Sequence, residues 1–244
     1  MSLTRSEYWR SKGRDYHNKA LFQLKRAEEV DLIRKNEEPF IFLQQGKELL
    51  QQAVTCYSKA TKEALTHSEL ASAHKNCAKA LVTLSYNEYD QGKIVENIQV
   101  LYHFSRALNS GLLSSFPDQW LNSLQDEYVN CFRNSLKICE QFDFIPKVTY
   151  LVKIERVIVD ECFKFRCLTE ICDSFLKIIV PLFGKKEYES VLVYTQECST
   201  FLTEADQVAV TRRDKILLSE MKKSNNALKI QASAILKMFK GEKR

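Results

Sequence analysis

Glycine and proline are scarce in this sequence, which has six Gly and four Pro among 244 residues. Folds with many tight turns, such as a β-sandwich or a sheet with a glycine-rich nucleotide loop, need more of both, because these residues supply the turn conformations. Apolar residues make up 45% and charged residues 27%, as in ordinary folded domains and unlike disordered chains. They recur three and four positions apart, which is typical of α-helices. We therefore expect an all-α fold of long helices.

Long hydrophobic runs are also missing. The longest, Ile178 to Phe183, contains Pro181 and ends at Gly184, whereas a membrane-spanning helix needs roughly 18 apolar residues. Residues 1–14 are basic, but the apolar core of a signal peptide does not follow them. The sequence therefore predicts a soluble cytoplasmic protein, and its eight cysteines are expected to be small core residues.

Patterns that would indicate catalysis or metal binding are absent from the sequence. There is no C-x-x-C, no G-x-S-x-G and no glycine-rich phosphate loop. Cys162, Cys167 and Cys172 are five residues apart, which rotates each by about 140° from the last on a helix, so they do not converge on one ion. His74 and Cys77 share a helical face, but no second pair of ligands accompanies them. We expect no catalytic residues, no metal, no cofactor and no small-molecule substrate, and hence not an enzyme.

Hydrophobic spacing and the positions of Gly and Pro divide the chain into nine expected helices with short connections. They cover residues 4–36, 39–66, 68–90, 93–110, 117–141, 145–165, 167–183, 185–202 and 204–240. Segment 145–165 is rich in β-branched residues, which favour strands. Tyr150, Ile154, Val157 and Ile158 nevertheless have helical spacing, and a helix is preferred here.

Three capping boxes are expected to start helices, because a hydroxyl and a carboxylate three residues apart satisfy free N–H groups of the first turn. They are Thr66 with Glu69, Ser115 with Asp118, and Thr203 with Asp206.

A spacing of small, aromatic and small residues recurs along the chain. Its copies are Ala53-x-x-x-Tyr57-x-x-Ala60, Val100-x-x-x-Phe104-x-x-Ala107 and, with changed residue types, Tyr188-x-x-Val191-x-x-x-Thr195-x-x-Cys198. This pattern resembles the second helix of the tetratricopeptide repeat, and Trp9-x-x-Lys12-Gly13-x-x-Tyr16 is similar to the first helix.

The resemblance implies antiparallel helical hairpins stacked as a right-handed array of about nine helices. The copies lie 47 and 91 residues apart, against about 34 in the standard repeat. Such intervals indicate hairpins of variable length, as in SNAP-type vesicle-fusion adaptors. The alternative is an ordinary helical bundle, in which small and aromatic residues also pack at this spacing.

In tetratricopeptide-like folds the first helices line a concave groove that binds peptides. By that resemblance, the polar residues of the third segment are candidate partner contacts, with simple solvent exposure as the alternative. They are His74, Lys75, Asn76 and Lys79.

Positive charge is concentrated at the C-terminal end. Residues 211–244 have ten Lys or Arg against three Asp or Glu, a net charge of +7 in a chain of +5. An apolar stripe with one Asn runs along this segment at helical spacing, through Leu218, Met221, Asn225, Leu228, Ala232, Ile235 and Phe239. The candidate partner contacts off the stripe are Lys222, Lys223, Lys229, Lys237 and Lys240.

Three interpretations of this helix compete. It could cap the array, bind a partner helix with Asn225 as the polar register position, or contact an acidic surface such as a membrane, nucleic acid or calmodulin-type protein. We expect a hairpin domain over 1–210 and this basic amphipathic helix over 211–244. The leading functional hypothesis is a non-catalytic adaptor or scaffold for a protein or peptide partner. The alternative is a peripheral nucleic-acid- or membrane-binding protein, and the oligomeric state is left open.

Overall fold

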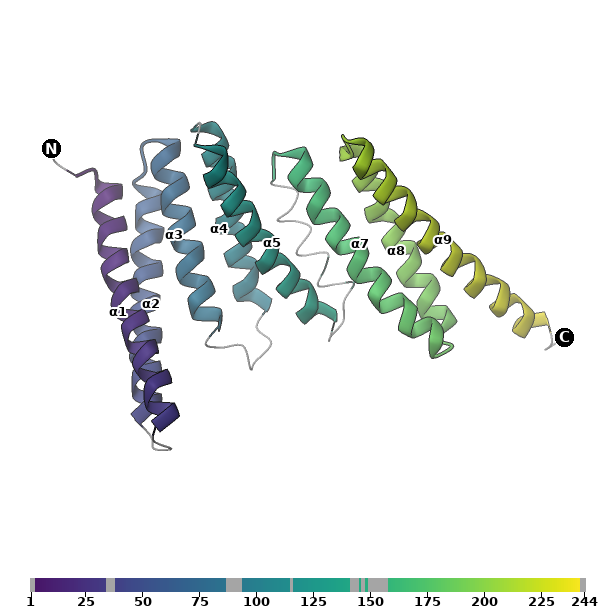
Figure 1. The fold of residues 1–244 in the computed structure, drawn as a ribbon, viewed down its shortest axis with the longest axis horizontal. Coiled ribbons are helices and arrows are strands. Elements are labelled where there is room, and N and C mark those ends of the chain that lie inside the picture. The colour runs from purple at the N-terminus through teal and green to yellow at the C-terminus, as the bar shows by residue number, and fades with distance from the viewer. Residues whose placement is uncertain are drawn as a thin grey trace. The chain divides into compact units, whose positions relative to one another are not determined.

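The protein is described here by a computed structural model, which places residues 3–33, 38–86, 94–114, 116–140, 145, 148 and 158–241. Within these residues the chain forms eight long α-helices and no strand, which confirms the all-α prediction. The helices are α1 (Arg5–Ile33), α2 (Glu38–Lys62), α3 (His67–Tyr86), α4 (Ile94–Leu113), α5 (Asp118–Glu140), α7 (Glu161–Gly184), α8 (Tyr188–Val208) and α9 (Arg212–Gly241), as labelled in Figure 1. Among the described helices, none combines the length and apolarity needed to cross a membrane.

The chain divides into two compact units, Met1–Cys131 and Phe132–Arg244, with the division inside α5. The boundary expected at residue 210 falls within the second unit, in the turn between α8 and α9.

In the first unit, α1 and α2 form an antiparallel hairpin. Their close approach depends on glycine, because a Cβ on Gly13 would lie 2.6 Å from Tyr57 Cε1, and a Cβ on Gly46 would lie 2.8 Å from Leu24 Cδ2. The Ser6 hydroxyl also donates to the carbonyl of Ala60, 3.0 Å away. Gly13 of the first-helix pattern and Tyr57 of the second-helix pattern thus pack against each other across the hairpin.

Helix α3 packs against α2 and pairs with α4. It runs parallel to α1, since Thr4 donates to Glu69 over 2.7 Å at one end and the Thr83 hydroxyl lies 3.5 Å from His17 Nε2 further along. Helices α1 and α3 are therefore equivalent first helices of successive hairpins.

In the second unit, α7 and α8 form a hairpin and α9 packs on both. The pairing of α7 with α8 is antiparallel, because Cys198 lies against Cys172 near the middle and Phe183 meets Tyr188 near the turn. Arg133, in the part of α5 that belongs to this unit, forms an ion pair with Glu170 of α7.

The recurring small and aromatic residues are core residues of the second helices. Their positions on α2, α4 and α8 are all at most 2% exposed: Ala53, Tyr57, Ala60, Val100, Phe104, Ala107, Val191, Thr195 and Cys198. The pattern therefore marks helix packing, as close-packed interiors require. The antiparallel hairpins that it predicts are confirmed within each unit.

Some predicted helix boundaries are wrong. Thr203 lies inside α8, where its hydroxyl donates to the Ser199 carbonyl over 2.8 Å, so it caps no helix. The expected break near residue 166 is also absent, since α7 runs without interruption from Glu161 to Gly184. The helix begins earlier than predicted because Asp160 caps it, accepting from the Phe163 N–H at 2.7 Å. The box at Thr66 forms, since its hydroxyl accepts from the Glu69 N–H at 3.1 Å. Ser115 and most of segment 145–165 lie outside the described residues.

Candidate functional site: a basic groove between α8 and α9

Helix α9 begins with a capping box that the sequence reading overlooked. The Thr211 hydroxyl accepts from the Asp214 N–H at 3.1 Å, while the Asp214 carboxylate accepts from the Thr211 N–H at 2.9 Å. This reciprocal pair ends the α8–α9 turn and fixes where α9 starts.

The predicted stripe of α9 packs against the preceding hairpin. Leu218, Met221, Asn225 and Ala232 are between 0% and 9% exposed, and α9 contacts both α8 and α7. Phe239, at the far end of the stripe, is 56% exposed. The stripe is thus used within the chain over most of its length, as the capping interpretation expects.

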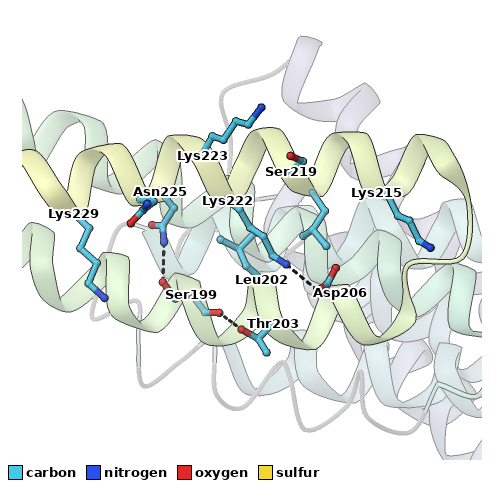
Figure 2. Close-up of a pocket in the computed structure, with 12 residues that line it drawn as sticks. Ser199, Leu202, Thr203, Asp206, Lys215, Ser219, Lys222, Lys223, Asn225 and Lys229 are labelled. Atoms are coloured by element: carbon cyan, nitrogen blue, oxygen red, sulfur yellow. Dashed lines mark hydrogen bonds and ion pairs between the residues drawn. The ribbon is translucent and has the colours of Figure 1, made fainter.

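Asn225 is the polar residue in this otherwise apolar interface. Its Nδ2 donates to the Thr195 carbonyl at 3.0 Å. It also donates to the Ser199 hydroxyl at 2.9 Å, the bond drawn in Figure 2. The side chain is 3% exposed, and its Oδ1 atom has no hydrogen-bond partner. Because a buried amide costs free energy unless it is paired, these two bonds specify the register of α9 on α8.

An open groove of about 570 Å³ runs along the line where α8 and α9 meet. Ten of the twelve residues that line it are polar or charged, and the other two are Leu202 and Leu218. The polar lining residues are Ser199, Thr203, Asp206, Lys215, Ser219, Lys222, Lys223, Asn225, Asn226 and Lys229. Four lysines and one aspartate are thus among the residues that line this groove.

Two of the four lysines have partners on α8. Lys222 Nζ lies 2.9 Å from Asp206 Oδ2, and Lys229 Nζ donates to Gln196 Oε1 at 2.7 Å. Figure 2 shows the Lys222–Asp206 pair within the groove, with Lys215 and Lys229 extending from the same helix on either side of it. Both pairs are at the surface, where such contacts stabilise a protein by at most about 1 kcal/mol. The ammonium groups can therefore exchange these partners for an anionic ligand at small cost.

The structure brings Lys222, Lys223 and Lys229 of the predicted set into this groove. Lys237 is exposed further along α9, and the side chain of Lys240 lies outside the described residues. Sequence reasoning missed Lys215 and all the groove residues of α8. A signal for Lys215 was present, because it precedes Lys222 and Lys229 on one seven-residue line.

The candidates on α3 are placed differently. His74 is 6% exposed, and Asn76 is half-buried. Lys75 Nζ lies 4.8 Å from the centre of the Trp120 ring, and Lys79 Nζ lies 3.1 Å from Glu127 Oε1, so both lysines contact α5. Burial lowers the pKa of Lys75, with the nearby Lys79 charge as a second cause. These contacts are internal to the first unit.

A partly buried set of contacting polar side chains connects α2, α3 and α4. Ser58 Oγ and Cys77 Sγ are 3.9 Å apart, Cys77 Sγ is 3.5 Å from His103 Nε2, and the Nδ1 atoms of His103 and His74 are 2.8 Å apart. Burial lowers the pKa of His74 to about 3 and of His103 to about 4, and raises the pKa of Cys77 to about 11. All three side chains are therefore neutral near pH 7.

The contact between Cys77 and His103 resembles a cysteine nucleophile paired with a histidine base, but these groups cannot act in that way here. A cysteine nucleophile needs a lowered pKa and access to substrate, and Cys77 is 0% exposed. His74 and Cys77 also meet opposite nitrogens of the His103 ring, so the three do not face a common point. Within the described part of the chain, no group of three His, Cys, Asp or Glu residues could hold a metal ion. The cluster is a packed contact between α3 and α4.

A second surface depression of about 410 Å³ lies between α1 and α2. Trp9 forms part of its wall, with Lys59 Nζ at 4.5 Å and Lys12 Nζ at 5.5 Å from the ring centre. Since both cations already lie over this ring, the depression is less open to a ligand than the groove along α9.

Comparisons with known proteins find few relatives. No protein-family model and no curated protein matches the chain. The crystal structure of a de novo designed helical repeat protein is similar at 10% sequence identity and a TM-score of 0.43, over 95% of this chain and 99% of that one. That similarity says nothing about function, which has to be argued from the groove itself.

Proposed function

We propose that this protein is a non-catalytic interaction scaffold of the cytoplasm, and that the groove between α8 and α9 binds an acidic region of a protein partner. The observation that carries the proposal is the line of ammonium groups along a preformed groove, with Asp206 as the opposing carboxylate. Surfaces of one charge attract and orient partners of the opposite charge. The tetratricopeptide-like pattern is consistent with such a role, since stacked hairpins commonly serve as binding surfaces.

The remaining chemistry favours a structural role for the residues that could otherwise suggest an enzyme. Three groups with strongly shifted pKa values, His74, Cys77 and His103, pack against one another between α3 and α4. The described cysteines form no disulfide bonds, as is usual in a reducing compartment. We therefore propose no substrate and no cofactor.

A membrane-surface role for α9 is less favoured than a protein partner. A helix that lies in a bilayer interface inserts its apolar face, but Leu218, Met221 and Ala232 of that face are packed inside the protein. Nucleic acid could still be attracted by the lysines, and it would show a steep loss of affinity as salt rises. The experiment below therefore tests both alternatives.

The test compares partner capture by the full chain and by a variant with Lys215→Glu, Lys222→Glu and Lys229→Glu. A photo-crosslinking residue in place of Ser219 traps the molecule that occupies the groove in cells, and mass spectrometry identifies it. A matched control reverses three exposed lysines elsewhere, Lys19, Lys62 and Lys185. Thermal unfolding followed by circular dichroism checks that every variant is folded.

We expect a protein with an acidic segment at the crosslink, lost in the groove variant and retained in the control. Binding should then be reproduced with the purified partner by calorimetry. Capture that is equal in the groove variant and the control would contradict the proposal. So would a crosslink to nucleic acid or lipid in place of protein.

A further inference from the structure

We propose that the groove between α8 and α9 binds an acidic α-helix, whose carboxylates repeat at seven-residue intervals. This inference rests on the proposed function of the groove and names the form of its ligand. It depends on the spacing of the lysines, the place of α9 in the fold and the polar chemistry of the groove wall.

The lysines form a straight line along α9. Lys215, Lys222 and Lys229 are seven residues apart and all line the groove. Since an α-helix rises 1.5 Å per residue and seven residues are nearly two full turns, their Cα atoms are about 10.5 Å apart on one side of the helix. A second helix lying along the groove has the same period. Carboxylates seven residues apart on that helix would meet all three lysines at once.

An extended peptide does not match this line. Its residues advance about 3.3 Å each, so 10.5 Å corresponds to about three residues. Because side chains of a strand alternate between two faces, residues three apart point in opposite directions. An extended acidic segment therefore cannot present successive carboxylates to Lys215, Lys222 and Lys229 from one face.

Helix α9 has a position in the second unit that corresponds to that of α3 in the first unit. In the first unit, a further helix packs against α3. Helix α3 contacts both helices of the hairpin before it, α1 and α2, just as α9 contacts α7 and α8. In addition α3 packs against α4, with His74 meeting His103 across that contact. Among the described helices of the second unit, none packs against α9 as α4 packs against α3. A partner helix would continue the packing that the first unit shows.

The groove wall indicates that this helix is largely polar. Ser199, Thr203, Ser219 and Asn226 line the groove together with the lysines. Ile230 is four residues after Asn226, on the same side of α9, and is 59% exposed, so it adds an exposed apolar group next to the residues that line the groove. The fitting ligand is therefore an acidic amphipathic helix with one apolar residue toward Ile230.

Asp206 already forms an ion pair with Lys222, the central lysine of the line. Its carboxylate lies 2.9 Å from Lys222 Nζ, where a carboxylate of the ligand would bind. Removing this charge without changing the shape of the side chain should leave Lys222 free for the ligand. Asp206→Asn is therefore expected to tighten binding of an acidic helix by about two- to fivefold.

The test uses the full chain and a fluorescent synthetic peptide, rich in Ala and Gln, with glutamates seven residues apart and one leucine. A second peptide has the same composition with the glutamates three residues apart, and a third has a central proline that breaks the helix. A single-stranded oligonucleotide and vesicles containing phosphatidylserine are measured at the same ionic strength. Fluorescence anisotropy gives the affinities.

We expect the seven-residue peptide to bind at least about tenfold more tightly than either control peptide. Lys215→Gln, Lys222→Gln and Lys229→Gln should each weaken it about two- to fivefold, and Ile230→Ser by no more than about threefold, because contacts at the edge of an interface contribute little. Lys19→Gln on α1 should have no effect. Circular dichroism of the bound peptide should show an increase in helicity.

Equal binding of the three peptides, no binding of any, or tighter binding of the oligonucleotide or the vesicles would overturn the helix as ligand. Groove-dependent binding of the spaced-by-three peptide would also overturn it, yet the groove would still be a docking surface for acidic segments. The failure of the proposed function is a separate result, because it appears as unchanged capture of the cellular partner by the groove variant.

Discussion

The Nδ1 atoms of His74 and His103 lie 2.8 Å apart across the contact between α3 and α4. One ring must donate and the other accept, so the contact cannot persist once both imidazoles are protonated. Burial is the main cause of the lowered pKa of each ring, and for His74 the neighbouring His103 adds to it. The first unit is therefore built around a pair that acid should disrupt.

Acid is expected to destabilise the protein through this pair. Because each pKa falls from 6.5 in the unfolded chain to about 3 or 4 in the folded one, the contribution is fully present above pH 6.5 and is lost as the pH falls toward 4. The loss at pH 5 is expected to be about 2 kcal/mol per ring. Urea unfolding at a series of pH values measures it.

The control for this prediction separates the pair from other acid-titrating groups. The double substitution His74→Leu with His103→Leu should reduce the dependence between pH 7 and 5, and part of what remains is assigned to His17, whose pKa is also lowered by burial. A double variant with the same pH dependence as the original chain would contradict the assignment.

Gly13→Ala should destabilise the hairpin of α1 and α2, although alanine favours helices over glycine by about 1 kcal/mol. The added Cβ would come within 2.6 Å of the Tyr57 ring, and overpacking of this kind costs about 1–3 kcal/mol. Thermal unfolding measures the change. At Gly184 a Cβ would meet nothing within 4 Å, so equal destabilisation by Gly184→Ala would argue against a steric cause.

Asn225→Asp should destabilise the second unit more than Asn225→Leu. Aspartate removes the Nδ2 donor and places a charge beside the Thr195 carbonyl, whereas leucine leaves that carbonyl and the Ser199 hydroxyl without one donor each. The loss of a buried hydrogen-bond partner costs about 1–3 kcal/mol, and more for a charge. Denaturant titrations rank the two variants. If leucine is the worse substitution, packing and not hydrogen bonding sets the register of α9.

Thr203 and Thr211 each begin a capping-box pattern in the sequence, but replacing them by alanine should change the stability of the protein to different extents. Thr211→Ala removes the cap of α9 and is expected to cost about 1 kcal/mol. Thr203→Ala removes only a bond to the carbonyl four residues earlier in α8, so its effect should be within about 0.5 kcal/mol. Comparable losses in the two unfolding midpoints would show that the cap is not what holds the start of α9.

Much of the fold could be predicted from local patterns. The spacing of Tyr57 and Phe104 with their small neighbours identified the packed faces of α2 and α4, because a helix brings residues three and four apart onto one side. The boundary between α8 and α9 could not be chosen in this way. Thr203 with Asp206 and Thr211 with Asp214 have the same capping-box form, and the side-chain bonds of the folded chain distinguish them.

The candidate site was predictable in part. Charge and periodicity indicated that Lys222, Lys223 and Lys229 lie off the apolar stripe of α9. Asp206 and Ser199 of α8 were not foreseen as neighbours, because they approach α9 only through tertiary packing. His74 shows the same limit, since its polar character suggested a surface position and His103 of α4 provides a buried partner.

The sequence by itself determined that the chain is helical, which face of each helix is apolar and that its basic charge is concentrated in the last helix. These properties depend on residues within a few turns of one another. Tertiary structure alone decided that the stripe of α9 is covered by α8 and α7 and that its lysines border a groove. The physical reason is that helical periodicity defines a face, whereas the neighbour of that face depends on residues distant along the chain.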